Sequence, residues 1–328
     1  MSDQRNTSLP NSLSLEDFRI TPVSGDIKPP GPLAARAAAA PQDPLGPLAG
    51  LRGTWRGTGF NQIWRPFNGS QDRFLELNET TEVLQFVEIP GDIPNRGFLQ
   101  GDITLHGLTY LQMINDANVR QNGQPAGIHI EPGIWVSVPV TTNPQDPETV
   151  ARLANIPHGT SLLAQGSSST SVGKPNFPTV SITPFTINPP NNPISFPETD
   201  LIKATTFRTP PTDIPNVTQA MVDNPNSVLE AGAVGKQIRS VTQLQISTID
   251  LNPPSSGGGT ANISFLQGTG GGPNAQAARM DATFWIEEFV DSDGNTHSQL
   301  QYSQRVLLNF NGLSWPHVSV GTLLRDAD

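Results

Sequence analysis

Histidine is the main side chain through which this protein could bind a metal or a cofactor, because the sequence contains five His and no Cys. Neutral imidazole is the commonest protein ligand for metals. His317 is the strongest candidate, since it follows Pro316 at the start of the second extended run of a hairpin over residues 300–324. The alternative is a structural histidine that is hydrogen-bonded beside an apolar strand.

The residues around His317 alternate as they do in a strand. His317 shares its face with the small residues Ser319 and Gly321, whereas Val318 and Val320 lie on the other face. Small neighbours would leave room beside the imidazole for a flat ligand. The same face could instead be exposed to solvent, and spacing alone does not choose between the two.

Two further histidines lie in extended segments. The strand predicted over 128–138 places His129 on one face and Ile128, with the other aliphatic residues, on the opposite face. This pattern predicts that His129 points away from the core, unless a bulge at Pro132 shifts the alternation. His158 lies at the start of an extended segment over 156–166 and ranks below His317 as a ligand.

The elements that must position these histidines are mostly strands and loops. The chain has 32 Pro and 30 Gly, with 35% hydrophobic and 15% charged residues, which predicts long loops around a modest β core in one domain. Alternating segments predict strands, and two segments predict short helices. The strands are expected near 51–60, 74–89, 101–113, 128–138, 236–251, 280–290 and 299–308, and the helices within 147–154 and 213–223.

The composition of residues 1–46, the net charge and the hydropathy of the chain indicate which kinds of partner and location to expect. Residues 1–46 contain a Pro-rich and Ala-rich leader, which we expect to be an extended or disordered arm, and the folded domain should span 47–328. The net charge of -10 argues against nucleic acid or anionic membrane as a partner. No apolar run is long enough to span a membrane, so a soluble, cytoplasmic protein is expected. A homo-oligomer is compatible with the sequence.

Several common enzyme signatures do not occur in the sequence. The Gly-x-Ser-x-Gly elbow, the His-Glu-x-x-His pair and the Walker loop are all absent. The turn Asp291–Asn295 resembles the first half of a calcium loop, but Tyr302 stands where the closing acidic residue belongs. What remains is an antiparallel β protein that could hold an apolar ligand or a cofactor in the mouth of a barrel.

Four short segments, read in order, resemble the nitrobindins, small haem-binding β-barrels similar in shape to fatty-acid-binding proteins. Gly53-Thr-Trp-Arg-Gly-Thr-Gly59 is similar to the opening Gly-Thr-Trp-Arg-Gly-x-Gly of that family. His129-x-Glu-x-Gly-x-Trp135 resembles its His-Arg-Glu-x-Gly-Tyr-Trp strand, and Leu163-Ala-Gln-Gly-Ser-Ser resembles its Ala-Gln-Ser-Thr-Gly segment. Trp315-Pro-His-Val-Ser-Val-Gly-Thr-Leu323 is similar to its near-terminal Gln-Pro-His-Leu-x-Ala-Thr-Leu.

The resemblance implies an all-β fold, a single antiparallel barrel of about ten strands with long Pro/Gly-rich loops. It implies haem b as cofactor, with His317 as the ligand to iron and His129 near the opposite side of the haem. Trp55 and Trp135 stand in the matching motifs, and His158 lies in an added segment close to the third match. All five are predicted to line the cofactor site.

The resemblance also implies a small diatomic or peroxy ligand, with nitric oxide binding, peroxynitrite isomerisation or peroxidase-like chemistry as the activity. The loops over 139–160, 167–235 and 252–279 have no counterpart in typical family members, so solvent access to the iron is expected to differ. One alternative is a lipocalin-like carrier of an apolar small molecule without metal. Another is an interaction protein whose loops carry the function and whose barrel interior is filled.

Overall fold

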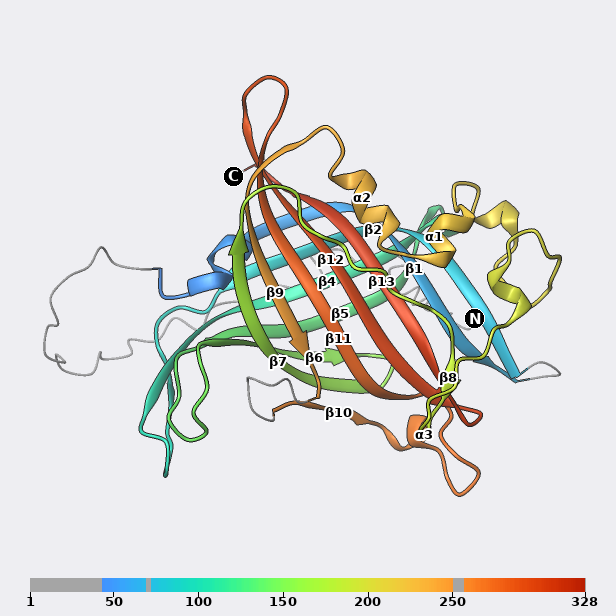
Figure 1. Cartoon of the computed structure of the whole chain (residues 1–328), viewed down its shortest axis with the longest axis horizontal. Helices are drawn as coiled ribbons and strands as arrows, with labels where there is room; N and C mark the ends of the chain where they lie inside the picture. The colour runs from blue at the N-terminus through green and yellow to red at the C-terminus, as the bar shows by residue number, and fades with distance from the viewer. Residues whose placement is uncertain (1–42, 69–71, 250–256, 328) are drawn as a thin grey trace, which may run out of the picture.

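The computed structural model describes residues 43–68, 72–249 and 257–327. Within these residues the chain forms one closed, ten-stranded antiparallel β-barrel (Figure 1). In order around the wall, the barrel strands are β1 (Gly53–Phe67), β2 (Asp72–Glu88), β4 (Ile103–Gln121), β5 (Gln124–Val138), β6 (Thr149–Ile156), β7 (Thr160–Ser171), β9 (Gln237–Ser247), β11 (Gln276–Val290), β12 (Thr296–Phe310) and β13 (Leu313–Arg325). The predicted all-β single barrel is therefore confirmed, while residues 1–42 of the predicted N-terminal arm lie outside the described residues.

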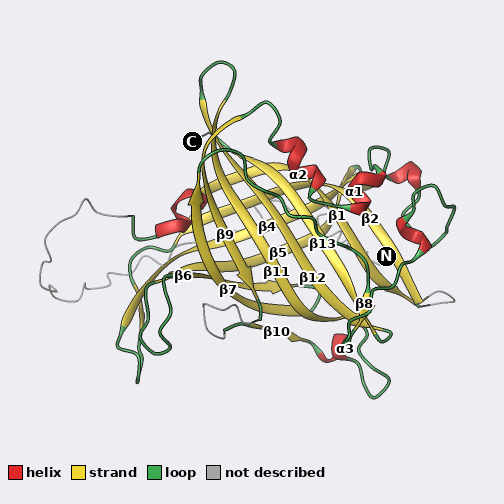
Figure 2. Cartoon of the chain, in the orientation of Figure 1, coloured by secondary structure: helices red, strands yellow, loops and turns green. Residues whose placement is uncertain are grey.

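The remaining elements are short and lie outside the barrel wall or across its ends (Figure 2). Three further strands pair at its margins: β3 (Ile93–Asn95), β8 (Phe185–Thr186) and β10 (Gly259–Asn262). The helical elements are η2 (Gly46–Leu51), η3 (Pro197–Thr199), η4 (Pro211–Asp213), α1 (Gln219–Asp223), α2 (Ser227–Gly232) and α3 (Ser264–Gln267). In the described residues, no helix is long and apolar enough to cross a membrane.

Pairing between the first and last strands closes the barrel. The β1–β13 ladder runs from Trp55 opposite Arg325 to Ile63 opposite His317. Most neighbouring strands in the wall are joined by hairpins, and the turn between β4 and β5 uses Asn122 and Gly123 with φ of 49° and 84°. Positive φ at both turn residues matches the twist of the two strands, which is why Asn-Gly is favoured there.

One end of the barrel interior is closed by η2. Leu45, Leu48 and Leu51 from this segment are fully buried and pack into the same apolar cluster as Trp55. The indole Nε1 of Trp55 donates to the carbonyl oxygen of Leu51 at 2.7 Å, which ties the plug to β1. This half of the interior is therefore filled by the protein's own side chains.

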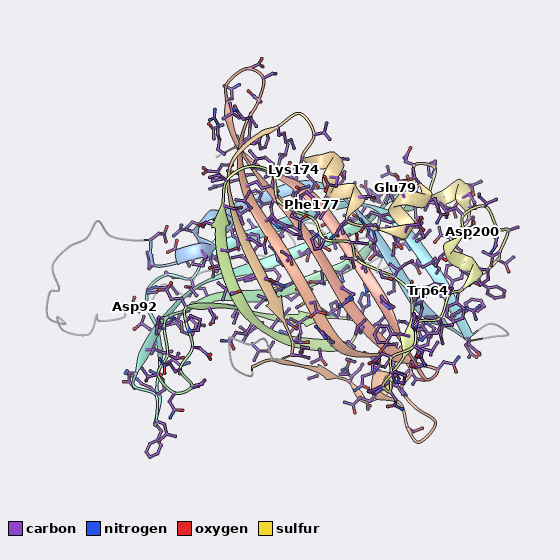
Figure 3. The ribbon with its side chains drawn as sticks, in the orientation of Figure 1. Trp64, Glu79, Asp92, Lys174, Phe177 and Asp200 are labelled. Carbon is purple, nitrogen blue, oxygen red and sulfur yellow. The ribbon has the colours of Figure 1, made fainter. Side chains whose placement is uncertain are left out.

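Residues 172–236, here called the covering segment, pack against the outside of the barrel (Figure 3). The indole of Trp64, on the outer face of β1, donates to the carbonyl oxygen of Ile182 in this segment at 2.9 Å. Phe177 packs edge-on against Trp285 of β11, with ring centroids 5.0 Å apart. The long Pro-rich stretch is thus ordered against the barrel, and α1 lies within the helical segment predicted over 213–223.

The helical turns predicted over 147–154 are wrong, because most of this segment forms the strand β6. Val150 and Ala154 are buried in the inner core, and Arg152 is also buried, whereas Leu153 is 40% exposed. This alternation fits a strand that pairs on one side with β5 and on the other with β7. Pairing on both edges satisfies the backbone and overrides the local preference for helix that Pro147 suggested.

The plug formed by η2 gives a first test. Leu48→Ala removes a fully buried side chain from the inner core and should lower the free energy of unfolding by about 2–5 kcal/mol. Chemical denaturation would measure this change. Leu99→Ala is the matched control, because Leu99 is 73% exposed and its loss should change stability by less than about 0.5 kcal/mol.

Candidate functional site

The barrel contains a cavity of about 350 Å³ in the half that η2 does not fill. The cavity and the plug lie at opposite ends of β1. Ile63, near the end of β1, pairs with His317 of β13, and both residues line the cavity. Trp55, near the start of β1, is bonded to the plug. Most of its lining surface is apolar, although many of the lining residues are polar. The aliphatic lining residues are Ile63, Ile114, Ile128, Ile156, Leu162, Leu266, Val306 and Leu308, with Met280, Ala275 and Ala277 beside them.

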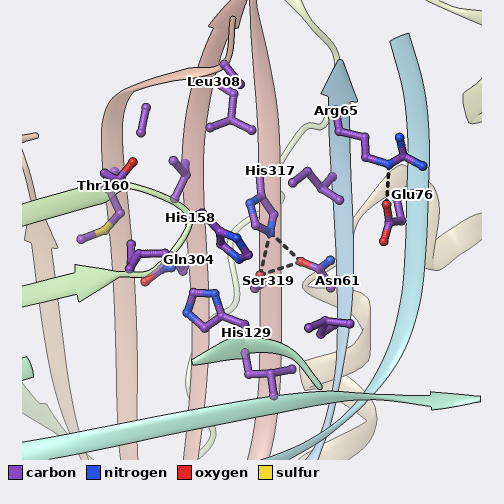
Figure 4. Close-up of a pocket in the computed structure, with 18 of the residues that line it drawn as sticks. Asn61, Arg65, Glu76, His129, His158, Thr160, Gln304, Leu308, His317 and Ser319 are labelled. Atoms are coloured by element: carbon purple, nitrogen blue, oxygen red, sulfur yellow. Dashed lines mark hydrogen bonds and ion pairs between the residues drawn. The ribbon is translucent and has the colours of Figure 1, made fainter. Parts of the chain in front are cut away.

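Three histidines from separate parts of the chain line this cavity, which we call the imidazole cavity (Figure 4). His317 comes from β13, His129 from β5, and His158 from the turn between β6 and β7. The ring centroids of His129 and His158 lie 5.8 Å apart. Three of the five predicted site residues are thus brought together.

The other two predicted site residues lie elsewhere. Trp55 and Trp135 are buried in the inner core and do not line the imidazole cavity. Trp55 is bonded to the plug, and Trp135 packs edge-on against Phe284 at 5.2 Å between ring centroids. Their place in the structure is the filled half of the barrel.

The prediction that His129 points away from the core is wrong. His129 lines the cavity, and Glu131 and Trp135 on the same face of β5 are buried, whereas Ile134 on the other face is 36% exposed. No bulge at Pro132 causes this, because Pro132 keeps its register opposite Leu111 of β4. The alternation failed because the interior face of this strand carries polar side chains whose hydrogen bonds are satisfied inside the barrel.

His317 is held by two polar neighbours. Its Nε2 donates to the amide oxygen Oδ1 of Asn61 at 2.6 Å, and the hydroxyl of Ser319 donates to the same oxygen at 2.8 Å. The predicted shared face of His317 and Ser319 is therefore confirmed, and it lines the cavity. Val318 and Val320 point outward into the cluster beneath the covering segment.

Burial keeps the imidazole of His317 neutral. Desolvation in the barrel interior, with repulsion from His129 and His158, lowers the pKa of His317 to about 3. Desolvation and repulsion from His129 also lower the pKa of His158, although a backbone hydrogen bond at Ile128 acts in the opposite direction. A neutral imidazole has a lone pair on one ring nitrogen, as a metal ligand or a hydrogen-bond acceptor requires.

His129 is oriented by a buried ion pair. Its Nε2 lies 3.3 Å from Oε2 of Glu131, and the other carboxylate oxygen of Glu131 accepts from Arg152 and from the hydroxyl of Tyr110. Burial alone would raise the pKa of Glu131, but Arg152 and the hydrogen bonds from His129 and Tyr110 outweigh it and lower that pKa to about 2. Glu131 is therefore ionised, and His129 donates to it through Nε2.

The guanidinium of Arg152 belongs to this network and is not free for an anionic ligand. It donates to Tyr110 Oη at 2.9 Å and to Oε1 of Gln304 at 2.7 Å, in addition to Glu131. Gln304 lines the cavity, so its amide connects the buried Arg152–Glu131 ion pair to the cavity wall. Positive and negative charge are thus balanced beneath the cavity.

Sequence reasoning missed the polar residues that hold the histidines, chiefly Asn61, Glu131 and Arg152. One signal could have found Asn61, because it has the same parity as the buried Trp55 in β1 and so must face inward. For Arg152 that signal was hidden by the helical interpretation of its segment.

The arrangement favours a bound molecule over a bare metal ion. Among residues 43–68, 72–249 and 257–327, no group of three or more His, Cys, Asp or Glu side chains is placed to hold a metal ion. The cavity instead combines imidazole and amide side chains with aliphatic residues, as small-molecule sites commonly do.

No protein-family model, curated protein sequence or solved structure matches this chain.

The pKa of His317 predicts a pH dependence of stability. An unfolded imidazole has a pKa near 6.5, so between about pH 6.5 and 3 the unfolded chain binds a proton that folded His317 does not. The free energy of unfolding should therefore fall as the pH falls through this window, by at most about 1.4 kcal/mol per pH unit from this residue. Denaturation of the protein and of His317→Gln from pH 7 to pH 4 would measure the difference.

The substitution should make the loss of stability in acid less steep. A second measurement, the pH titration of the His317 ring protons by NMR, should show no protonation between pH 5 and pH 8. A midpoint within that interval would contradict the prediction.

Proposed function

We propose that this protein binds a small, mainly apolar molecule in the imidazole cavity, and that this molecule is haem b with His317 as the ligand to iron. The observation that carries the proposal is the convergence of His317, His129 and His158 on one aliphatic cavity in the open half of the barrel. The four segments that resemble the nitrobindins support haem in particular.

The chemistry of the His317 side chain would suit a ligand to haem iron. The ring is neutral, and one nitrogen is bonded to a side-chain oxygen, as in metal-ligating histidines, which usually donate their second N–H to an oxygen acceptor. That bond occupies Nε2. Coordination would therefore use Nδ1, or it would use Nε2 after the hydrogen bond to Asn61 is released.

Haem, when bound, would supply an iron centre for a small diatomic or peroxy ligand, and peroxynitrite isomerisation or peroxidase-like chemistry would follow from that centre. The protein's contribution would be to exclude water with the aliphatic lining and to hold imidazoles near the ligand. His129, anchored by Glu131, and His158, at the turn after β6, are the groups that could hold or transfer a proton there.

A metal-free carrier of an apolar small molecule is the second candidate. The observation that favours it is the hydrogen bond between His317 and Asn61, because it already satisfies Nε2 without a metal. In this case the histidines and amides would bind the polar end of the molecule, and the aliphatic residues would contact the rest.

Titration with hemin separates the two candidates. The proposal expects a saturable change of the Soret band on addition of hemin to the purified protein. His317→Ala should weaken binding by at least about tenfold and shift the band, because the ligand to iron is lost. His297→Ala is the matched control, because His297 is bonded to Asp291 at the β11–β12 hairpin and does not line the cavity.

Two results would contradict the haem proposal. A titration without any saturable Soret change would exclude haem binding, and a His317→Ala spectrum identical to that of the unsubstituted protein would exclude His317 as ligand. Tight binding of retinol, measured by its fluorescence, together with no response to hemin would favour the metal-free carrier.

A further inference from the structure

A line of hydrogen-bonded side chains joins His317 to a buried carboxylate. Nε2 of His317 lies 2.6 Å from Oδ1 of Asn61, whose Nδ2 donates to Oδ1 of Asn78 at 3.0 Å. Nδ2 of Asn78 in turn donates to Oδ2 of Asp116 at 2.8 Å. The four residues stand on the adjacent strands β13, β1, β2 and β4, and Asn78 and Asp116 are almost completely buried.

The direction of every hydrogen bond in this line is set at Asp116. Its other oxygen, Oδ1, accepts from the backbone N–H groups of Asn118 and Val119 at 2.8 and 2.9 Å. These residues lie where the register between β4 and β5 shifts, after Asp116. A carboxylate has only acceptor sites, so the side chain of Asn78 must turn its NH₂ group toward Asp116.

The orientation of Asn78 determines the orientation of Asn61, and that of Asn61 determines which nitrogen of His317 carries the hydrogen. Asn78 then presents its oxygen to Asn61, and Asn61 presents its own oxygen to His317. Because that oxygen can only accept, Nε2 of His317 carries the hydrogen and the lone pair of the neutral ring is on Nδ1. The hydroxyl of Ser319 donates to the same Asn61 oxygen and so supports this orientation.

We propose that Asp116 is a positioning residue for His317, which it holds as the Nε2–H tautomer through Asn78 and Asn61, so that Nδ1 is the ring nitrogen open to a ligand. Only the statement that Nδ1 is open to a ligand rests on the proposed function, because the tautomer is a property of the protein without ligand.

The tautomer restricts the ligand class. A lone pair on Nδ1 binds a metal centre, or accepts from a hydroxyl or N–H of the ligand, but it offers nothing to a carboxylate. His129 likewise donates through Nε2 to the ionised Glu131. Arg152 is engaged by Glu131, Tyr110 and Gln304, so it does not change this selection. At His317 a hydroxyl should therefore bind in preference to a carboxylate, while Arg65, which also lines the cavity, is paired through its Nε with Glu76.

Long-range ¹H–¹⁵N NMR of histidine-labelled protein, at pH 7 without ligand, identifies the tautomer of His317 and so tests the proposal. The unsubstituted protein should show hydrogen on Nε2 and none on Nδ1. In Asp116→Asn the side-chain oxygen is still required by the N–H groups of Asn118 and Val119, so the new NH₂ faces Asn78. Both asparagines should then reverse, and the hydrogen of His317 should move to Nδ1.

A second variant tests the proposal if Asp116→Asn does not fold. Asn78→Ala interrupts the line without changing its charge and should leave both tautomers populated. Asp102→Asn is the control, since Asp102 is an exposed residue paired with Arg96, and it should not alter the His317 signals. An unchanged Nε2–H tautomer in both Asp116→Asn and Asn78→Ala would overturn the proposal.

Hemin binding distinguishes this proposal from the proposed function. Asp116→Asn should weaken hemin binding about 10–100-fold, as is usual for residues that orient a metal ligand. A tautomer switch with unchanged hemin affinity would support the role of Asp116 and exclude His317 as the ligand to iron.

Discussion

The β1–β13 ladder is the interaction on which the rest of this structure depends. By closing ten strands into a barrel, it removes the two open edges of the sheet and encloses an interior that side chains must fill or that a ligand can occupy. One half is filled by aromatic residues and by the leucines of η2. The other half retains the imidazole cavity. The same ladder places His317 beside β1, where Asn61 can reach it.

Charge in the interior is tolerated because it is paired. The ionised Glu131 and Arg152 are both fully buried, and a buried pair is stable only when its remaining hydrogen-bonding capacity is also satisfied. Tyr110, Gln304 and His129 supply those bonds. The network therefore fixes the orientation of His129 while leaving the cavity without a free cation at this point.

The sequence predicted features that depend on one strand alone better than features that depend on contacts between strands. Alternation predicted that His317 and Ser319 share a face, and composition predicted a β core with long loops, whereas the single barrel was implied by the resemblance to the nitrobindins. Sequence reasoning failed where partners come from other strands. Asn61 and Asn78 are 17 residues apart, and Asn78 and Asp116 are 38 apart, so their contact depends on a register that one sequence does not reveal.

The failures at His129 and Arg152 have one cause. Apolar residues were assumed to face the core, yet Ile134 on the aliphatic face of β5 is partly exposed, and the inner face carries Glu131 and His129; Ile128, at a register shift, also lines the cavity. Arg152 was not recognised as an interior residue because Pro147 suggested a helix. In both segments a paired polar interior has the periodicity of a solvent-exposed face, and only the tertiary structure distinguishes the two.

The covering segment makes the two sides of the imidazole cavity mechanically unequal. The strands that carry Asn61 and His317 are covered on their outer faces, because Trp64 of β1 is bonded to Ile182 of the covering segment and Val318 and Val320 of β13 lie in the same buried cluster. The outer faces of β5, β6 and β7 have exposed aliphatic residues, among them Ile134, Leu153 and Leu163. Local opening costs least where few buried contacts are broken. Local opening of the cavity should therefore cost less free energy at the wall that holds His129 and His158 than at the wall that holds His317.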